Sequence, residues 1–172
     1  MNHTSSKTII HYVHSDAQKT RARFKGVNCM VLISEIKVAF STVKRPKEDL
    51  FISHEQEEGE REYFFEKKWQ DCKANELSYH SSALFLFTPE AHTYFLPAFM
   101  IQSIEHPKEA DQIPDYLLYH FYDYEKPFWK KRIDILTNEQ KEVVSKFLMH
   151  VHNDDESSEL YMENALHGLR SS

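Results

Sequence analysis

Hydrophobic residues recur at helical spacing over most of the chain, and short polar stretches separate them. After Asn28, which favours a helix N-cap, the apolar positions repeat at steps of three and four until residues 44–46 (KRP) supply a stop signal. These positions are Leu32, Ile33, Ile36, Ala39, Phe40 and Val43. The same period returns over residues 143–151, after Thr137 and Gln140 form a capping box. Both stretches predict amphipathic helices.

The clearest helix start lies at residues 88–90. Thr88 is a good N-cap, Pro89 takes the first helical position, where its missing N–H is not needed, and Glu90 meets the positive end of the helix dipole. Apolar residues then occupy nearly every face up to residue 104, which predicts a central helix packed on more than one side. Pro97 removes one backbone hydrogen bond from this helix and predicts a bend there.

Shorter segments complete the pattern. We expect helices over residues 75–79, 113–126 and 160–169, and one running from Glu55 towards Trp69, with acidic residues at its start and basic residues at its end. The spacing predicts a buried stripe on that last helix, made by Phe65, Trp69 and Cys72. Residues 83–87 (ALFLF) fit either a buried strand or the approach to the next helix.

The pattern as a whole predicts a mainly α fold. We expect one compact helical domain over residues 27–170, a bundle of five to seven helices with room for one short strand pair. Residues 1–26 lack a sustained helical period and are predicted to form a basic N-terminal arm, in which residues 8–13 (TIIHYV) favour a short strand or a docked extended segment.

Charge divides the chain into a basic arm and an acidic body. Residues 1–26 carry a net charge of +4, against −6 for the whole chain. An acidic body repels phosphate, which disfavours nucleic acid as a partner and favours a basic protein. The apolar runs are too short to cross a bilayer, so no membrane partner is expected. With only Cys29 and Cys72 and no leader-like N-terminus, we expect a reducing, cytoplasmic setting.

Composition also bears on fold and chemistry. Three glycines disfavour all-β folds and Gly-rich phosphate loops, and 13% aromatic residues predict a core filled largely by Phe and Tyr. The sequence contains no hydrolase, nucleotide or dinucleotide motif, and neither cysteine lies in a pattern that favours a thiolate. We therefore predict no catalytic residue and no cofactor, and we take both cysteines as structural.

The densest polar feature is the segment 54–62 (HEQEEGERE). Its carboxylates form either a solvated helical turn or an acidic surface that binds a partner. The candidate partner-binding residues are Glu55, Glu57, Glu58, Glu60 and Glu62. His54 and Glu58 are four residues apart, but the zinc-protease pattern needs a second histidine where Glu58 stands, so no metal site is predicted.

Two other features carry weaker hypotheses. A pocket opened by the bend at Pro97 would be lined by Glu90 and Tyr94, and carboxylates in such a cleft can divide acid and base roles or hold a metal. Residues 126–132 (KPFWKKR) combine basic and aromatic side chains, as proteins that bind single-stranded nucleic acid do. The alternative is that these residues form a connector between two helices, in which Trp129 fills the core.

Histidine is frequent, yet its spacing supports no metal site. His92 and His120 are each interpreted as a surface or core-edge residue with a structural role.

One stretch resembles a known family. The segment FTPEAHTYFLPAFM, preceded by KKWQD and followed by ILTNEQKEVVSKFL, resembles a bacterial family of unknown function with a TPEAxxYxLPA core motif. The resemblance covers roughly residues 32–151, and it leaves out the basic arm and the segment after His152. It implies a shared fold unit and no particular activity.

Charge and the absence of catalytic motifs together favour a non-catalytic protein that binds a basic partner, such as an immunity protein or an inhibitor. The alternatives are an enzyme or a small-ligand or metal-binding domain near Pro97, using Glu57, Glu60, Glu90 or Tyr94, and a nucleic-acid accessory protein using residues 126–132.

Overall fold

The fold is built from helices. The computed structural model describes residues 28–47, 49–52, 58–152 and 159–171. Within these residues the helices are α2 (Cys29–Ala39), α3 (Glu58–Phe64), the 3-10 helix η1 (Trp69–Asp71), α4 (Ala74–Tyr79), α5 (Ala83–Leu86), α6 (Pro89–Glu105), α7 (Pro107–Ala110), α8 (Ile113–Tyr122), α9 (Pro127–Asp134), α10 (Asn138–Val151) and α11 (Glu159–Ser171). Seven of the α-helices have seven or more residues, so the predicted mainly α bundle is confirmed.

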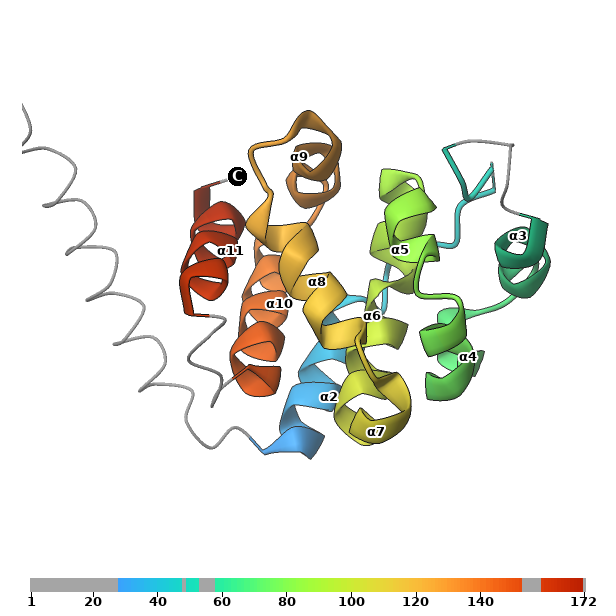
Figure 1. The fold of residues 1–172 in the computed structure, drawn as a ribbon, viewed down its shortest axis with the longest axis horizontal. Coiled ribbons are helices and arrows are strands. Elements are labelled where there is room, and N and C mark those ends of the chain that lie inside the picture. The colour runs from blue at the N-terminus through green and yellow to red at the C-terminus, as the bar shows by residue number, and fades with distance from the viewer. Residues whose placement is uncertain (1–27, 48, 53–57, 153–158, 172) are drawn as a thin grey trace, which may run out of the picture.

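Helix α6 is the central element, as the sequence predicts. Thr88 caps it, since its Oγ1 accepts a hydrogen bond from the Ala91 amide at 3.3 Å, and the helix continues through Pro97 to Glu105. Every side chain from residue 91 to residue 101 is buried. Helix α6 packs against α2, η1, α4 and α7 to α10, which places it between the two ends of the molecule (Figure 1).

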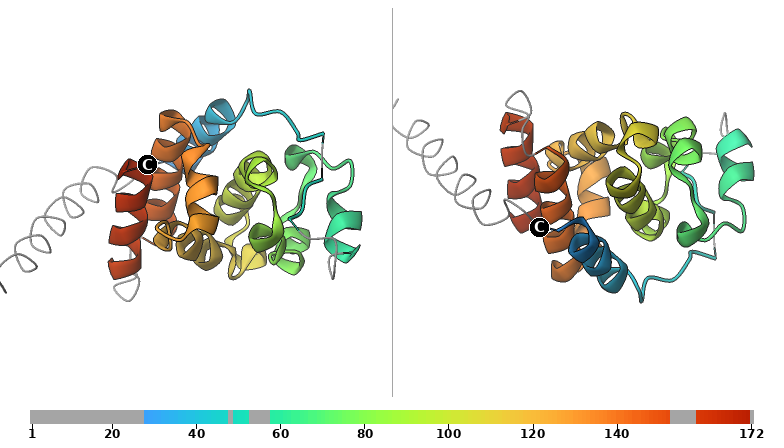
Figure 2. Two further views of the ribbon diagram at one scale, coloured as in Figure 1. Left: turned by 90° about the horizontal axis from the view of Figure 1, so that it is seen from above. Right: turned by 90° about the horizontal axis from the view of Figure 1, so that it is seen from below.

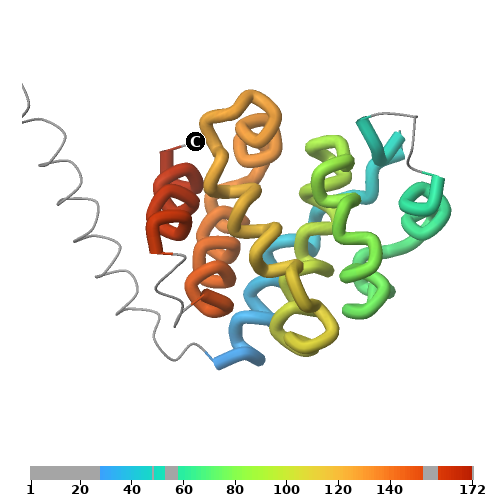
Figure 3. Tube along the Cα trace, viewed as in Figure 1, coloured from blue at the N-terminus to red at the C-terminus, as the bar shows by residue number. Residues whose placement is uncertain are grey.

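The C-terminal helices form one end of the molecule. Helix α10 packs between α2 and α11, and α11 packs on α8, whereas α3 lies at the opposite end in all views (Figure 1, Figure 2, Figure 3). The capping box at the start of α10 is confirmed, with bonds of 3.0 and 3.2 Å between Thr137 and Gln140. The Gln140 side chain also donates to the Ala39 carbonyl at 3.1 Å, so the capping residue ties α10 to the last turn of α2.

The predicted strand pair is reduced to a single bridge. Phe51 and Phe87 form an isolated antiparallel bridge, supported by backbone hydrogen bonds from Ile52 to Leu86 and from Thr88 to Leu50. The apolar run 83–87 is thus mostly the short helix α5, and only its last residue is extended. The described residues contain no sheet.

Phenylalanine fills much of the core, as the composition predicts. The largest fully buried side chains include seven phenylalanines: Phe40, Phe64, Phe87, Phe95, Phe99, Phe121 and Phe147. The rings of Phe87 and Phe95 stack with centroids 5.1 Å apart, and Phe64 contacts both of them edge-on at 4.9 and 4.8 Å. These contacts join the bridge and α3 to the central helix.

The stripe predicted on the acidic helix is wrong. Helix α3 ends at Phe64, so Phe65 does not share a helical face with Trp69 and Cys72. Glu66 adopts a φ of 56°, a left-handed conformation that costs an L residue on the order of 1 kcal/mol. The chain turns there, which leaves Phe64 buried and Phe65 72% exposed.

Two further expectations need correction. Helix α2 ends at Ala39, four residues before the predicted end of its apolar pattern, and Val43 packs on the core from outside the helix. Residues 127–134 form helix α9 and not a connector, because Pro127 suits a first helical position and Lys130 pairs with Asp134 one turn later. The predicted basic arm, residues 1–26, lies outside the described residues.

Candidate binding sites

The predicted glutamate surface is described in part. Glu58, Glu60 and Glu62 lie on α3, whereas Glu55 and Glu57 lie outside the described residues. Glu58 and Glu62 are exposed, and Glu60 is half-buried, with its Oε1 accepting a hydrogen bond from the Ser82 hydroxyl at 2.8 Å. The described glutamates therefore give negative charge to a short helix at one end of the molecule.

The residues predicted to line a pocket near Pro97 lie on one helix but in different surroundings. Glu90 is exposed in the first turn of α6, whereas Tyr94 and Pro97 are buried within the core. Burial raises the pKa of the Tyr94 hydroxyl, so this phenol stays protonated at neutral pH. The linings of three pockets in the described part of the chain do not include Glu90, Tyr94 or Pro97.

A buried polar cluster lies beside the start of α6. His92 on α6, His120 on α8 and Arg132 on α9 are 1%, 2% and 2% exposed, so both histidines lie deeper than the surface or core edge expected from sequence. The imidazole rings lie 5.7 Å apart between centroids, and the Trp129 ring stacks on His120 at 4.2 Å. In the described part of the chain, no partner accepts from or donates to any of the four imidazole nitrogens.

Arg132 holds α9 to the segment that precedes α6. Its Nη2 donates to the Phe87 carbonyl and its Nη1 donates to the Phe128 carbonyl, the latter at 2.8 Å. Its guanidinium lies over the Phe128 ring, 3.7 Å from the centroid. Burial lowers the pKa of Arg132 to about 10, which still leaves the side chain charged at neutral pH.

Burial also decides the protonation of the two histidines. It lowers the pKa of His92 to about 3 and that of His120 well below its ordinary value, and the Arg132 charge acts in the same direction on both. Both imidazoles are neutral at physiological pH. A charged guanidinium and two neutral rings, closed off from solvent, hold α6, α8 and α9 together but offer no exposed reactive group.

The largest of the described pockets is a groove between α2 and α10. It has a volume of about 590 Å³ and apolar residues on both helices. The apolar lining is Met30, Val31, Val38, Ala39 and Val143. Three of these, Met30, Val31 and Val38, are 72%, 52% and 71% exposed, which is unusual for apolar side chains gathered in one place. The sequence signal was present, because apolar residues surround α2 and cannot all face one core.

Carboxylates border this groove. Glu35 lies on α2, and Glu139 and Glu142 lie on α10. Lys146 is the basic residue in the lining, and its Nζ donates to Glu35 at 3.1 Å and pairs with Glu142 at 3.2 Å. Three carboxylates against one ammonium leave the groove with a negative charge over an apolar floor.

The two cysteines differ in environment. Cys72 is buried, and burial raises its pKa to about 12, which agrees with the structural role expected for it. Cys29 is exposed and occupies the first residue of α2, with its Sγ 3.7 Å from the His150 Nε2. Cys29 therefore lies at the helix start that the N-cap Asn28 predicts.

In the segment of basic and aromatic residues, 126–132, Trp129 fills the core as the connector interpretation expects. Trp129 is buried, 6% exposed, between Phe85 and His120, whereas Lys130 and Lys131 face solvent on α9. Arg132 is the residue of this segment whose role the sequence pattern did not reveal, since a buried arginine and an exposed one look alike at helical spacing.

Two other kinds of site, a metal centre and a membrane-spanning helix, are absent from the described residues. No group of three or more His, Cys, Asp or Glu residues within them is placed to hold a metal ion. Among the helices described, none combines the length and the apolar character that crossing a membrane requires.

One comparison with known proteins gave a match. The model of a family described as "Family of unknown function (DUF6714)" matches residues 28–167. This match confirms the resemblance found over residues 32–151 and extends it, so most of the segment after His152 lies inside the family. No curated protein and no solved structure matches the chain.

Proposed function

The chain belongs to the family of unknown function DUF6714, and we propose that it is a non-catalytic binding protein whose groove between α2 and α10 takes a basic amphipathic helix of a partner protein. The observation that carries the proposal is the combination of exposed apolar side chains and bordering carboxylates in one groove. Such a protein would act as immunity proteins or inhibitors do, by occupying a surface of its partner.

The shape of the groove suits a helix. Val31 and Val38 are seven residues apart on α2, close to two helical turns, and Met30 adjoins Val31. They form an apolar strip along the helix axis that Ser34 and Glu35 interrupt. A partner helix laid along this strip would bury apolar side chains at its two ends and meet Ser34 and Glu35 between them, in the helix-in-groove mode of recognition. Burial of this strip would remove the largest exposed apolar surface on α2.

The charge of the groove selects the partner. Glu139 and Glu142 lie on the α10 side of the apolar strip, so lysine or arginine flanking the partner's apolar face would meet opposite charge there. The glutamates of α3 lie at the other end of the molecule (Figure 1). They supply a second acidic surface that a large basic partner could also reach.

The proposal is tested with two synthetic helical peptides that share one apolar face, one carrying lysine on its polar face and the other glutamate. We expect the lysine peptide to bind and the glutamate peptide to bind at least about tenfold more weakly. Val38→Asp and Glu142→Lys should each weaken the lysine peptide by about tenfold or more, measured by fluorescence anisotropy. The affinity should also fall as salt rises.

Two matched controls separate the groove from general surface effects. Ile135→Asp places a charge on an exposed apolar residue outside the groove, and Glu105→Lys reverses an exposed charge at the end of α6. Both should bind the lysine peptide as the unchanged chain does. Equal binding of the two peptides, or equal loss in the control variants, would remove the proposal.

Other occupants of the groove give distinct results. A second copy of this chain would appear as a dimer in sedimentation that Val38→Asp abolishes. Occupation by the chain's own basic residues 1–26 would appear as peptide binding that improves in the double variant Arg21→Glu and Arg23→Glu. Either result would contradict a partner helix as the occupant.

A further inference from the structure

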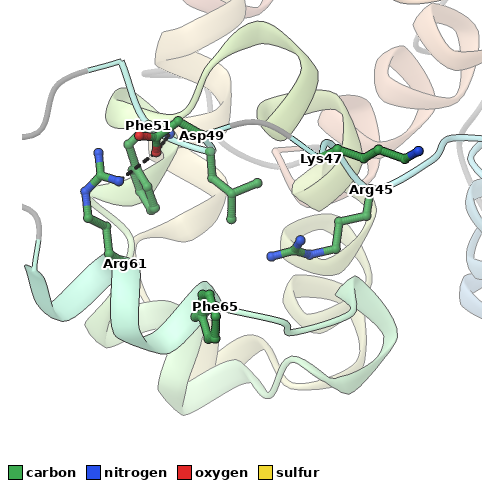
Figure 4. A pocket seen from close by; sticks show the side chains of 7 residues that line it. Arg45, Lys47, Asp49, Phe51, Arg61 and Phe65 are labelled. Carbon is green, nitrogen blue, oxygen red and sulfur yellow. Dashed lines mark hydrogen bonds and ion pairs between the residues drawn. The ribbon is translucent and has the colours of Figure 1, made fainter.

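A second pocket, with the opposite charge, lies between the segment after α2 and helix α3. It has a volume of about 320 Å³, at the small end of the range for small-molecule sites. Three basic residues and one carboxylate line it together with apolar groups (Figure 4). The lining residues are Arg45, Lys47, Asp49, Leu50, Phe51, Arg61 and Phe65.

Arg45 is held in a fixed position beside this pocket. Its Nη2 donates to the Phe64 carbonyl at 3.2 Å and its Nε donates to the Lys67 carbonyl at 3.3 Å. These carbonyls belong to the C-terminal end of α3 and the turn after it, where helical partners run out. Figure 4 shows the guanidinium of Arg45 directed into the space between Phe65 and the segment that carries Phe51. The arginine is therefore oriented before any ligand arrives.

Arg61 forms the other basic wall. Its Nη1 lies 2.6 Å from the Asp49 Oδ1, and its guanidinium lies over the Phe51 ring, 5.2 Å from the centroid. The same Asp49 oxygen accepts a hydrogen bond from the Phe51 amide at 3.3 Å. Asp49 thus neutralises one of the basic residues and leaves the lining with a net positive charge.

The apolar part of the pocket has one unusual member. Leu50 and Phe51 are 8% and 3% exposed and form a fixed apolar surface, whereas Phe65 is 72% exposed. The left-handed turn at Glu66 keeps Phe65 pointing outward while Phe64 enters the core. An aromatic ring kept in solvent beside an oriented arginine is a surface on which a flat apolar group can lie.

We propose that this pocket binds a small organic anion that has one carboxylate and a flat apolar body. The carboxylate would lie at Arg45, whose planar fork matches it, and the apolar body would lie between Phe65 and the surface of Leu50 and Phe51. A dianionic phosphate fits less well, because the Asp49 carboxylate lines the same pocket and repels the second negative charge.

The test uses phenylacetate as the probe, with 2-phenylethanol as its neutral counterpart, acetate as the anion without a ring, and inorganic phosphate. Titrations of the full chain are followed by two-dimensional NMR. Phenylacetate should saturate shifts of residues 45–51 and 61–65, and each of the other three compounds should bind at least about tenfold more weakly. Phosphate binding as tightly as phenylacetate, equal binding of the alcohol, or no saturable shift would overturn the proposal.

Variants test separately where the carboxylate and the apolar body of the ligand bind. Arg45→Gln and Phe65→Ala should each weaken phenylacetate by about tenfold, and Lys47→Gln by only about twofold, because Figure 4 shows its side chain running away from the others. Lys44→Gln and Phe128→Ala are the matched controls, since neither residue lines the pocket, and both should leave the affinity unchanged.

Phe65→Ala removes an exposed side chain and so should leave the fold intact, even where Arg45→Gln disturbs the end of α3. Unchanged phenylacetate binding in Phe65→Ala would overturn the proposed site. The lysine peptide used for the groove should not compete with phenylacetate, so failure at one site does not imply failure at the other.

Discussion

The interior cluster of His92, His120 and Arg132 and the groove between α2 and α10 depart from ordinary burial in opposite ways. In the cluster, polar groups are buried, and the imidazole nitrogens have no hydrogen-bond partner among the described residues. In the groove, apolar side chains that usually lie inside are exposed beside carboxylates. Both arrangements cost free energy, but the side chains of the first are shielded from solvent and those of the second face it.

From this difference we propose that the cluster serves stability and that the groove serves binding. Arg132 donates to the Phe87 carbonyl outside its own helix and to the Phe128 carbonyl within it, so part of the cost of burying the cluster is offset within the fold itself. Nothing within the described residues covers Met30, Val31 and Val38, so the cost at the groove is one that a partner would remove. Changes in the cluster should therefore alter stability, and changes in the groove should alter binding.

The largest effect is expected from Arg132→Ala. The change removes the side-chain donor to the Phe87 and Phe128 carbonyls and the packing against Phe128 and Trp129. We expect a loss of about 2–4 kcal/mol in the free energy of unfolding, measured by urea denaturation. Lys130→Ala on the same helix removes an exposed ion pair and should cost less than about 1 kcal/mol. Equal losses in the two variants would show that Arg132 does not hold the cluster together.

The next effect is a loss of stability in acid caused by the buried histidines. Burial lowers the pKa of His92 to about 3 in the folded state, while the unfolded chain keeps a value near 6.5. The unfolded state therefore binds the proton first, so stability is complete above about pH 6.5 and falls as the pH drops from there towards 3. Each such histidine contributes up to about 1.4 kcal/mol per pH unit.

Replacement of one histidine tests this explanation. His120→Phe removes one of the two buried imidazoles, so the slope of stability against pH between 6.5 and 4 should become shallower. His106→Gln changes an exposed histidine and should leave the slope as it is. A slope that is the same in all three proteins would assign the acid sensitivity to carboxylates such as Glu76, whose pKa is lowered by its hydrogen bond with Lys67.

Much of the fold could be predicted, because capping and periodicity are local. A capping residue forms its hydrogen bonds within the first turn of its helix. The structure accordingly has helix starts at the positions indicated by Thr88 and Pro89 and by the pair Thr137 and Gln140. One prediction that failed depends on a turn. The left-handed conformation of Glu66 ends the pattern that joined Phe65 to Trp69, and glutamate gives no sequence signal for it.

The binding sites could be predicted less well, because they combine residues distant in sequence. Met30 and Val38 lie outside the apolar period predicted for this helix, and only the structure shows that α10 borders them. Arg45 is part of a predicted stop signal, and only the structure shows that it donates to a carbonyl at the end of α3. The acidic partner-binding surface expected from the sequence, including the α3 glutamates, stays a prediction. Arg132 could not be separated from its exposed neighbours, since burial depends on the packing of α9 on α6.

The smallest effect on stability, and the sharpest test of the comparison, is expected from Val38→Asp. Val38 is 71% exposed, so the change should alter the free energy of unfolding by less than about 0.5 kcal/mol in urea denaturation. The same variant should lose binding of the lysine peptide, whereas Arg132→Ala should keep that binding under conditions where it remains folded. If Val38→Asp were destabilised by about 2 kcal/mol or more, the strip on α2 would be part of the core's support, and the division between a stabilising interior and a binding exterior would fail.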